Sequence, residues 1–139
     1  MARYYIYTDG GARGNPGPAA TGVVILDAQK KKIKTASSYL GEATNNVAEY
    51  AALIRALELV VELAELPLEN IEIHAYLDSE LIVKQLKGNY KVKNKGLKPL
   101  FEQVNKLSLP FRKITYTHIP REENAEADML VNEELDKHV

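Results

Sequence analysis

Cysteine and tryptophan are both absent from the 139 residues, and there is no long apolar run. Without cysteine the chain can form no disulfide framework, no thiolate metal site and no thiol nucleophile. The first ten residues lack the apolar core of a signal peptide, and no stretch approaches the roughly 18 apolar residues of a membrane span. We therefore expect a cytoplasmic protein that does not bind membranes.

Several motifs of common catalytic sites are missing as well. The glycines of GARGNPG, residues 11–17, are spaced by three and match neither the dinucleotide-binding fingerprint nor the phosphate-binding P-loop. His74, His118 and His138 do not have the spacing of a zinc site. No G-x-S-x-G segment is present, which argues against a serine nucleophile on a strand-to-helix turn.

The overall charge is nearly balanced, but its distribution is not. The formal net charge of -1 gives no general attraction to nucleic acid, whereas residues 84–98 contain six lysines and no acid. The length and a hydrophobic content of 45% favour one globular domain spanning residues 1–139.

Hydrophobic periodicity predicts an α/β fold. Strands are expected at residues 3–9, 21–27, 32–40, 71–77 and 113–118. Helices are expected at residues 45–66, 79–87, 97–107 and 123–136. The order βββαβααβα favours a five-stranded mixed sheet flanked by helices, with its first three strands antiparallel.

Two acidic side chains stand out against this pattern. Asp9 ends the first predicted strand, where an aspartate before glycine is also common as a turn residue. Glu49 shares a helical face with Ala52 and Ala56, and a carboxylate buried there is costly unless it is paired or metal-bound. Asn46 and Glu49 also fit a capping box, which accounts for the helix start but not for the apolar face.

Two further acids follow a strand or lie in a helix. Asp78 comes directly after strand 71–77; this position fits a helix N-cap, but it is also where open α/β sheets bind ligands. Asp128 lies in a helix rich in acids and fits a solvated charge. Together with Asp9 and Glu49 these acids would form a cluster whose mutual repulsion divalent cations relieve. Two such ions can hold the attacking and leaving oxygens of a phosphodiester displacement.

Four segments carry a family resemblance when they are taken in order. They are TDGGARGNPGPAA (8–20), TNNVAEY (44–50), LDSELIV (77–83) and REENAEADMLVNEELD (121–136). These segments resemble the four motifs of type 1 ribonuclease H, and the likeness runs from Tyr5 to about Asp136. The chain is similar to the shorter archaeal and bacterial members that lack a long basic protrusion.

The resemblance implies a ribonuclease H-like fold and an endonuclease that hydrolyses the RNA strand of RNA–DNA hybrids, leaving 5′-phosphate and 3′-hydroxyl ends. It implies two Mg²⁺ ions, replaceable by Mn²⁺, held by Asp9, Glu49, Asp78 and Asp128. The expected partner is the hybrid, with double-stranded RNA open as a second substrate, and the expected state is a monomer.

The resemblance also assigns substrate contacts to small and amide residues: Gly10, Gly11, Asn15, Thr44, Asn45 and Asn46. Asparagine both donates and accepts, so it can read a 2′-hydroxyl, and glycine lets the backbone approach the RNA closely. Asn15 also fits turn chemistry before Pro16, and Asn45 and Asn46 also fit helix capping.

Two residues compete for a role in turnover. His118, ten residues before Asp128, has the spacing of a histidine in many members, but it ends a predicted strand. Arg121, seven residues before Asp128, resembles an arginine that some archaeal and bacterial members use instead. We favour Arg121 and leave His118 open between a catalytic and a structural role.

The lysine-rich stretch is expected to be a loop over residues 88–95. Lys87, Lys91 and Lys93 are candidates for phosphate contacts, and Tyr90 could stack on a base or sugar. The alternative is a solvated loop. Glu80 stands where a glutamine is common in the family; it would weaken RNA binding or cap the helix.

Three other functions compete with the enzyme. A catalytically inactive hybrid-binding module usually lacks one of the four acids, and all four are present. A resolvase or proofreading exonuclease of the same superfamily lacks GNPG and the paired asparagines. A structural α/β domain would have to carry four coincident motifs by chance.

Overall fold

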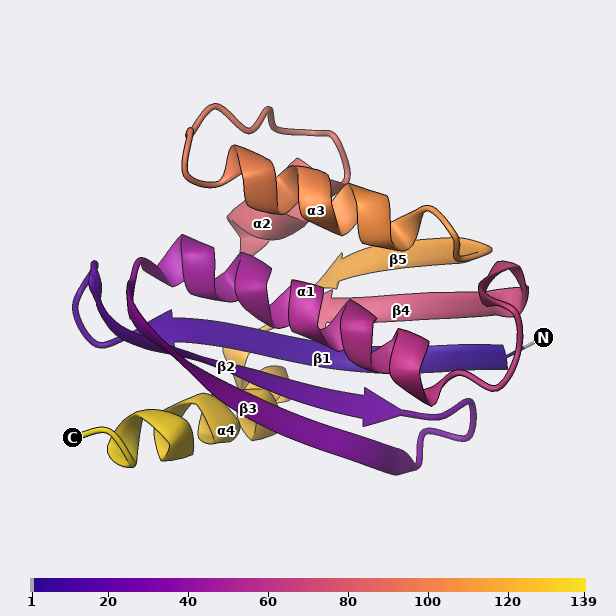
Figure 1. The fold of residues 1–139 in the computed structure, drawn as a ribbon, viewed down its shortest axis with the longest axis horizontal. Coiled ribbons are helices and arrows are strands. Elements are labelled where there is room, and N and C mark those ends of the chain that lie inside the picture. Colours follow the sequence, from indigo (N-terminus) through magenta and orange to yellow (C-terminus); the bar gives the residue numbers. More distant parts are fainter. Residues whose placement is uncertain (1) are drawn as a thin grey trace.

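The computed structural model describes residues 2–139. Its strands are β1 Ala2–Ala12, β2 Gly17–Leu26, β3 Lys32–Ala43, β4 Ile71–Leu77 and β5 Lys113–His118. Its helices are α1 Asn45–Leu63, α2 Glu80–Leu86, α3 Lys98–Ser108 and α4 Ala125–Asp136, with short 3-10 turns at Leu68–Asn70 (η1) and Arg121–Asn124 (η2). The predicted element order and mixed five-stranded sheet are confirmed (Figure 1).

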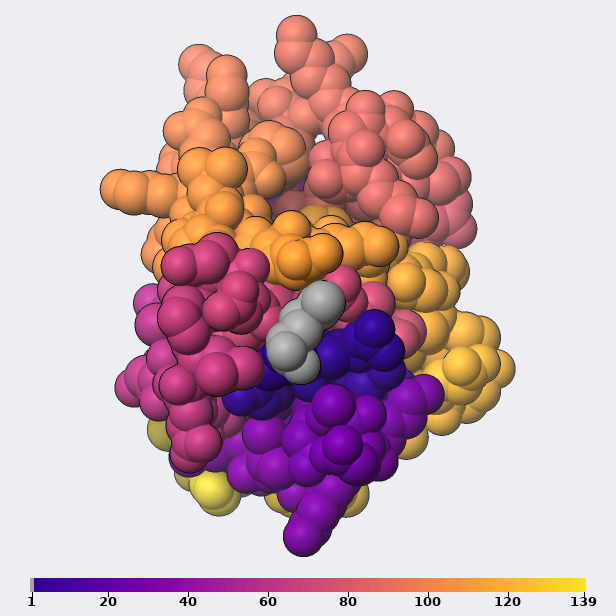
Figure 2. Space-filling view, turned by 90° about the vertical axis from the view of Figure 1, so that its right-hand side faces the viewer, coloured from indigo at the N-terminus to yellow at the C-terminus, as the bar shows by residue number. Residues whose placement is uncertain are grey.

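The sheet has the strand order β3-β2-β1-β4-β5. β1, β2 and β3 are antiparallel neighbours, while β4 runs parallel to β1 and β5 runs parallel to β4. Helix α1 lies across one face of the sheet with α2 and α3 beside it, and α4 lies on the other face (Figure 1). Figure 2 views the molecule from the end where β1 begins, next to the β2–β3 turn. Within residues 2–139, no helix has the length and apolar character needed to cross a bilayer.

The main core lies between the sheet and α1. Its fully buried side chains include Ile6 of β1, Ile25 of β2 and Ile73 of β4. Helix α1 contributes Leu53 and Leu57, at the helical spacing that its sequence shows.

Two glycines allow the helices to touch the strands. A Cβ on Gly10 would lie 2.1 Å from the backbone of Ala48 in α1. A Cβ on Gly22 would lie 2.3 Å from the carbonyl oxygen of Ala127 in α4. Because both positions lack a side chain, the residues that follow Ala48 and Ala127 are brought directly against β1 and β2.

The predicted end of the first strand at Asp9 is wrong. β1 continues to Ala12 because residues 10–12 keep pairing with β2, which begins at Gly17 instead of residue 21. The parallel pairing with β4 stops earlier, at Thr8 and Leu77. Asp9 is therefore the first residue of β1 without a partner on the β4 side.

Other boundaries also differ from the predictions. β3 extends to Ala43, paired with Gly17 of β2, instead of ending at residue 40. Helix α1 ends at Leu63 instead of residue 66, because the backbone of Ala64 is already extended. The last helix begins as the 3-10 turn η2, and its α-helical part starts at Ala125 instead of residue 123.

Candidate active site

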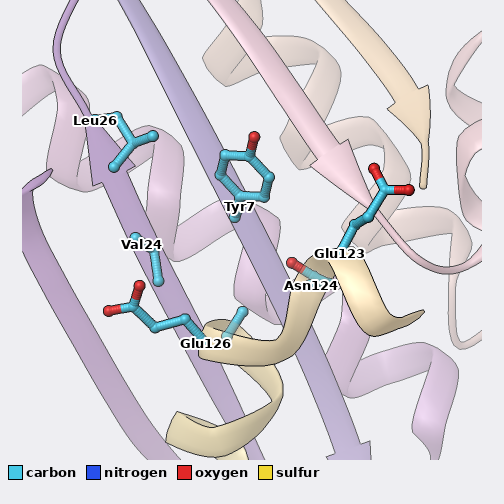
Figure 3. A pocket seen from close by; sticks show the side chains of 7 residues that line it. Tyr7, Val24, Leu26, Glu123, Asn124 and Glu126 are labelled. Atoms are coloured by element: carbon cyan, nitrogen blue, oxygen red, sulfur yellow. The ribbon is translucent and has the colours of Figure 1, made fainter. Parts of the chain in front are cut away.

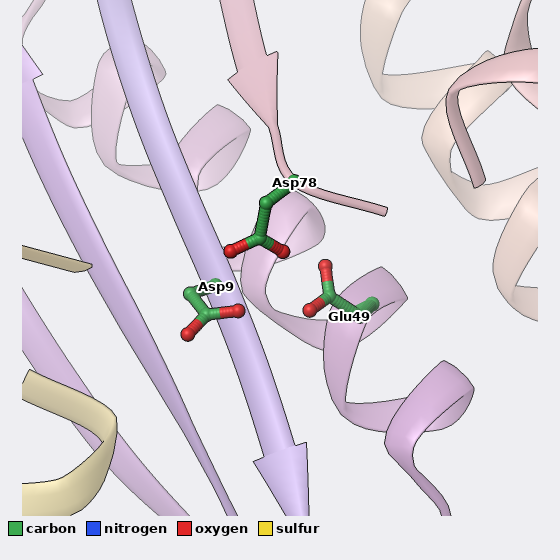
Figure 4. Close-up of side chains that lie close together, drawn as sticks. All are labelled: Asp9, Glu49 and Asp78. Atoms are coloured by element: carbon green, nitrogen blue, oxygen red, sulfur yellow. The ribbon is translucent and has the colours of Figure 1, made fainter. Parts of the chain in front are cut away.

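Three acidic side chains lie close together where the pairing of β1 with β4 ends. Asp9 lies on β1 just past the last parallel pair, and Asp78 follows the last residue of β4. Glu49 reaches the same place from α1 (Figure 4). One carboxylate oxygen from each of the three lies within 4.8 Å of those of the other two.

Glu49 is placed by the start of α1. Thr44 caps the helix, since its hydroxyl accepts a hydrogen bond from the Val47 N–H at 3.2 Å. Asn46 and Glu49 therefore do not form the capping box that their spacing also fits. Glu49 Oε1 instead accepts from the Gly10 N–H at 3.2 Å, which ties α1 to β1. Its Oε2 atom is buried without a hydrogen-bond donor among residues 2–139.

Asp78 is not a helix cap either. Ser79 caps α2 by accepting from the Ile82 N–H at 3.3 Å, so the alternative of an N-cap at Asp78 is excluded. The Asp78 carboxylate is left facing the cluster. Its Oδ2 accepts a hydrogen bond from Asn124 Nδ2 at 3.4 Å.

The cluster is electrostatically strained. Burial raises the pKa of Asp9 to about 7, and the charges of Asp78 and Asp128 add to that rise. Burial also raises the pKa of Glu49 well above its usual range. Within residues 2–139 no lysine or arginine forms an ion pair with Asp9, Glu49 or Asp78. Such a cluster is compatible with a divalent metal ion.

An open pocket of about 340 Å³ lies over the acids. Its lining from the N-terminal half is Asp9, Gly10, Gly11, Ala12, Arg13, Asn45, Asn46 and Glu49. Its lining from the C-terminal half is Asp78, Ser79, Arg121, Asp128, Val131, Asn132 and Leu135. All four predicted acids are thus brought to one pocket, although Asp128 lies outside the compact group of three.

The structure separates the two candidates for turnover. Arg121 lines the pocket, and its Nη2 lies 3.8 Å from Asp128 Oδ1. Its side chain is 79% exposed, so it is accessible from the solvent. His118 ends β5, as predicted, and lies outside the residues that line the pocket.

The predicted asparagines hold the neighbouring loops together. Asn45 Oδ1 accepts from the Ala12 N–H at 2.9 Å, and Asn15 Oδ1 accepts from the Asn45 N–H at 3.0 Å. These bonds tie the β1–β2 turn to the start of α1. A second pocket of about 280 Å³ opens there; its lining is Asn15, Thr44, Asn46, Val47, Asn94, Gly96 and Leu97.

The lysine-rich segment lies outside the acid pocket. Lys87, Lys91 and Lys93 line no part of it, and Tyr90 is 48% exposed. The Lys84 ammonium lies 5.0 Å from the centroid of the Tyr90 ring and 2.8 Å from the Glu80 carboxylate. One face of the Tyr90 ring is therefore already covered.

Sequence reasoning missed three residues near the acids. Arg13 lines the pocket and pairs with Asp136 of α4 at 2.7 Å. Asn94 joins the second pocket from the lysine-rich loop. Asn124 is buried and contacts Asp78. Arg13 and Asn124 lie within segments 8–20 and 121–136, so the family resemblance could have drawn attention to them. Their contacts with distant residues could not be read from the sequence.

A further pocket of about 220 Å³ lies between the start of α4 and strands β1 and β2 (Figure 3). Its lining is Tyr7, Val24, Leu26, Glu123, Asn124, Glu126 and Ala127. None of the four clustered acids contributes to it.

Comparisons with known proteins give a consistent picture. The profile of the family described as "Reverse transcriptase-like" matches residues 7–134. The "Bifunctional protein Rv2228c" of Mycobacterium tuberculosis is 42% identical over 132 residues, which cover 94% of this chain and 35% of that protein. "Ribonuclease HI" of Halobacterium salinarum is 40% identical over 134 residues, covering 96% of this chain and 65% of that protein. The chain thus spans between a third and two thirds of these curated relatives.

Two of the matching solved structures are covered over nearly their full length. LC11-RNase H1, isolated from compost, is 50% identical with a TM-score of 0.92, covering 99% of both chains. The structure of LC11-RNase H1 in complex with an RNA/DNA hybrid matches with a TM-score of 0.90, covering 97% of this chain and 98% of that one.

Proposed function

Because the chain belongs to the ribonuclease H family, we propose that it hydrolyses the RNA strand of RNA–DNA hybrids and leaves 5′-phosphate and 3′-hydroxyl ends. The observation that carries this proposal is the convergence of Asp9, Glu49 and Asp78 beside an open pocket. We propose further that residues 1–139 form one ribonuclease H domain that acts as a monomer. The cytoplasmic location stays a prediction.

The donor set of the cluster fits divalent metal ions. Its ligands are hard carboxylate oxygens, no cationic side chain pairs with the three within residues 2–139, and Glu49 Oε2 is buried without a donor. We propose that Asp9, Glu49, Asp78 and Asp128 hold two Mg²⁺ ions, which Mn²⁺ can replace. Bound there, the ions would activate water and stabilise charge on the leaving oxygen.

The chain's own residues orient the substrate. Gly10 and Gly11 line the pocket, and Gly11 has no side chain on the Val131 side of it, so an RNA backbone can approach β1 closely there. The Oδ1 atoms of Asn15 and Asn45 already accept from the main chain, which leaves their Nδ2 groups to donate to the substrate. The Arg121 guanidinium, at the rim beside Asp128, can contact the scissile phosphate.

The second pocket is suited to a backbone phosphate of the hybrid. It lies at the N-terminus of α1, where the helix dipole favours an anion. Thr44, Asn46 and Asn15 supply polar groups to it. A phosphate held there would fix the hybrid relative to the acids.

The lysine-rich loop is proposed as an outer contact. Lys87, Lys91 and Lys93 would bind phosphates beyond the two pockets. Tyr90 would offer a base or sugar the face of its ring that Lys84 leaves uncovered. Double-stranded RNA is a second candidate substrate, because its A-form geometry resembles that of the hybrid more than double-stranded DNA does.

The direct test is a cleavage assay. Labelled RNA–DNA hybrid, double-stranded RNA and double-stranded DNA are each incubated with the protein and Mg²⁺, and again with a chelator. We expect metal-dependent cutting of the hybrid that is lost in Asp9→Asn. Asp27→Asn is the matched control, since Asp27 lies in the β2–β3 turn and only accepts local backbone hydrogen bonds. Tight hybrid binding without cutting would instead identify an inactive binding module.

A further inference from the structure

Asn124 lies at the N-cap position of α4 but does not cap it. An asparagine there normally accepts a hydrogen bond from an N–H of the first turn, and Asn124 makes no such bond. Its side chain turns inward and is 2% exposed. Figure 3 shows it where η2 meets α4, beside Tyr7 of β1.

The inward-facing amide links two strands. Asn124 Nδ2 donates to the Thr8 carbonyl oxygen at 2.8 Å and to Asp78 Oδ2 at 3.4 Å. Thr8 and Leu77 are the last parallel pair between β1 and β4, so the amide continues the connection where the backbone ladder ends. One side chain thus ties the residue before Asp9 to the carboxylate of Asp78.

The same residue also belongs to the third segment of the site. Asp128 lies four residues further on, one turn into α4. Asn124 therefore connects β1, the end of β4 and the start of α4, which carry three of the four acids. Within residues 2–139, its Nδ2 is the only side-chain or backbone donor that bonds the Asp78 carboxylate.

Fold stability alone does not explain why an amide side chain is buried at residue 124. Its Oδ1 atom is buried without a hydrogen-bond donor among residues 2–139, which costs stability. The helix also loses the cap that the residue could have supplied.

We propose that Asn124 is a positioning residue of the acidic cluster, which orients Asp78 relative to Asp9 and thereby sets the affinity of the cluster for divalent cations. The inference rests on the proposed function in one respect, namely that the cluster is the metal site. Groups that orient metal ligands typically change metal affinity by about 10–100-fold when they are removed.

The test is a Mg²⁺ titration of isotopically labelled protein without substrate, followed by NMR at the Gly10 and Gly11 amides. Gly10 is a direct reporter, because its N–H donates to Glu49. We expect Asn124→Ala to weaken Mg²⁺ binding about tenfold or more. Asn124→Ser, which keeps a polar group before α4, serves if the alanine variant folds poorly, and it is expected to weaken binding similarly.

Val104→Ala is the matched control for lost stability, since Val104 is fully buried in α3, away from the acid pocket. Unchanged Mg²⁺ affinity in the Asn124 variants would overturn the inference. An equal loss of Mg²⁺ affinity in Val104→Ala would also overturn it. So would NMR signals of Gly10 and Gly11 that do not shift when Mg²⁺ is added to the wild-type protein. Normal Mg²⁺ binding without hybrid cleavage would defeat the proposed function and leave this inference standing.

Discussion

At the scale of single residues, Asp9 and Glu49 are the two carboxylates that residues 2–139 bury, and both carry a raised pKa. Neither would be placed there for stability, because burying an unpaired charge is unfavourable. The two carboxylates also repel Asp78, which lies within the same 4.8 Å group. The free protein therefore carries a cost that a bound cation can offset.

This cost predicts how stability depends on pH. The folded pKa of Asp9, about 7, lies above the ordinary value of 3.8, so the folded state binds a proton more tightly than the unfolded state. The free energy of unfolding should therefore fall as pH rises from about 4 to about 7. Asp9→Asn, which carries no charge, should be more stable than wild type by roughly 2–4 kcal/mol above pH 7 and by little below pH 4, since one pKa unit is about 1.4 kcal/mol.

Urea unfolding in chelator at several pH values measures this difference. Asp27→Asn is the control; it removes a charge from an exposed turn and should give no such gain. A gain from Asp9→Asn that is the same at both ends of the pH range would contradict the assignment to burial.

Gly10 gives a second prediction at this scale. A methyl group at Gly10 would lie 2.1 Å from the backbone of Ala48 and 2.4 Å from the Glu49 nitrogen, so α1 would have to move. Gly10→Ala should lower the free energy of unfolding by about 3 kcal/mol, as overpacking against a rigid backbone does. Chemical denaturation measures this loss.

Gly11→Ala is the paired control, because its methyl group would meet only the Val131 side chain at an ordinary 3.5 Å. It should fold normally and reduce hybrid binding, since the added group projects into the pocket. Equal stability losses in the two variants would show that close packing on α1 is not the cause.

At the scale of elements, local sequence patterns predicted which helices and strands form better than they predicted where each one ends. The helical period of α1 was readable because Leu53 and Leu57 are buried at its spacing. The continuation of β1 past Asp9 was not readable, since it depends on pairing with β2 and not on local propensity. Thr44 was expected only as a substrate contact, yet it is the cap of α1, because several polar residues precede α1 and only the backbone geometry selects one.

The segment between α2 and α3 carries the prediction about charge. If Lys91, Lys93 and Lys95 contact phosphates, replacing all three by alanine should make the slope of log affinity against log salt shallower by about 2–3, or roughly 0.9 per lost contact. Hybrid binding would be measured in the Asp9→Asn background at several salt concentrations.

The control replaces Lys31, Lys34 and Lys106, three exposed lysines outside this loop, and changes the net charge equally. An unchanged slope in the loop variant would place that loop outside the binding surface. Equal changes in both variants would indicate a general charge effect.

At the scale of the whole molecule, the site exists only when distant segments meet. Asp9, Glu49 and Asp78 come from β1, α1 and the end of β4, and Asp128 comes from a helix on the opposite face of the sheet. The sequence motifs identified these four acids, because each stands at a marked position. They could not identify Asn124 as their connection, because its partner Thr8 is 116 residues away in the chain.

A site assembled only by folding predicts that metal stabilises the whole domain. An ion that binds the folded state alone adds RT ln(1 + [L]/Kd), about 2.7 kcal/mol at a hundredfold excess over Kd. Saturating Mg²⁺ should therefore raise the Tm of the wild-type protein by several degrees. Because protons compete for the carboxylates, the increase should be larger at pH 8 than at pH 5, on either side of the Asp9 pKa of about 7.

Thermal unfolding with and without Mg²⁺ measures the effect in three proteins. Asp27→Asn should respond like the wild type, whereas Asp9→Asn should respond little, since it has lost a ligand and no longer carries the charge that the cation offsets. The two arms of the comparison separate a metal site from a general salt effect. A general salt effect would raise the Tm of all three proteins equally. The loss of stability from burying the acids would then not be offset by a bound metal ion.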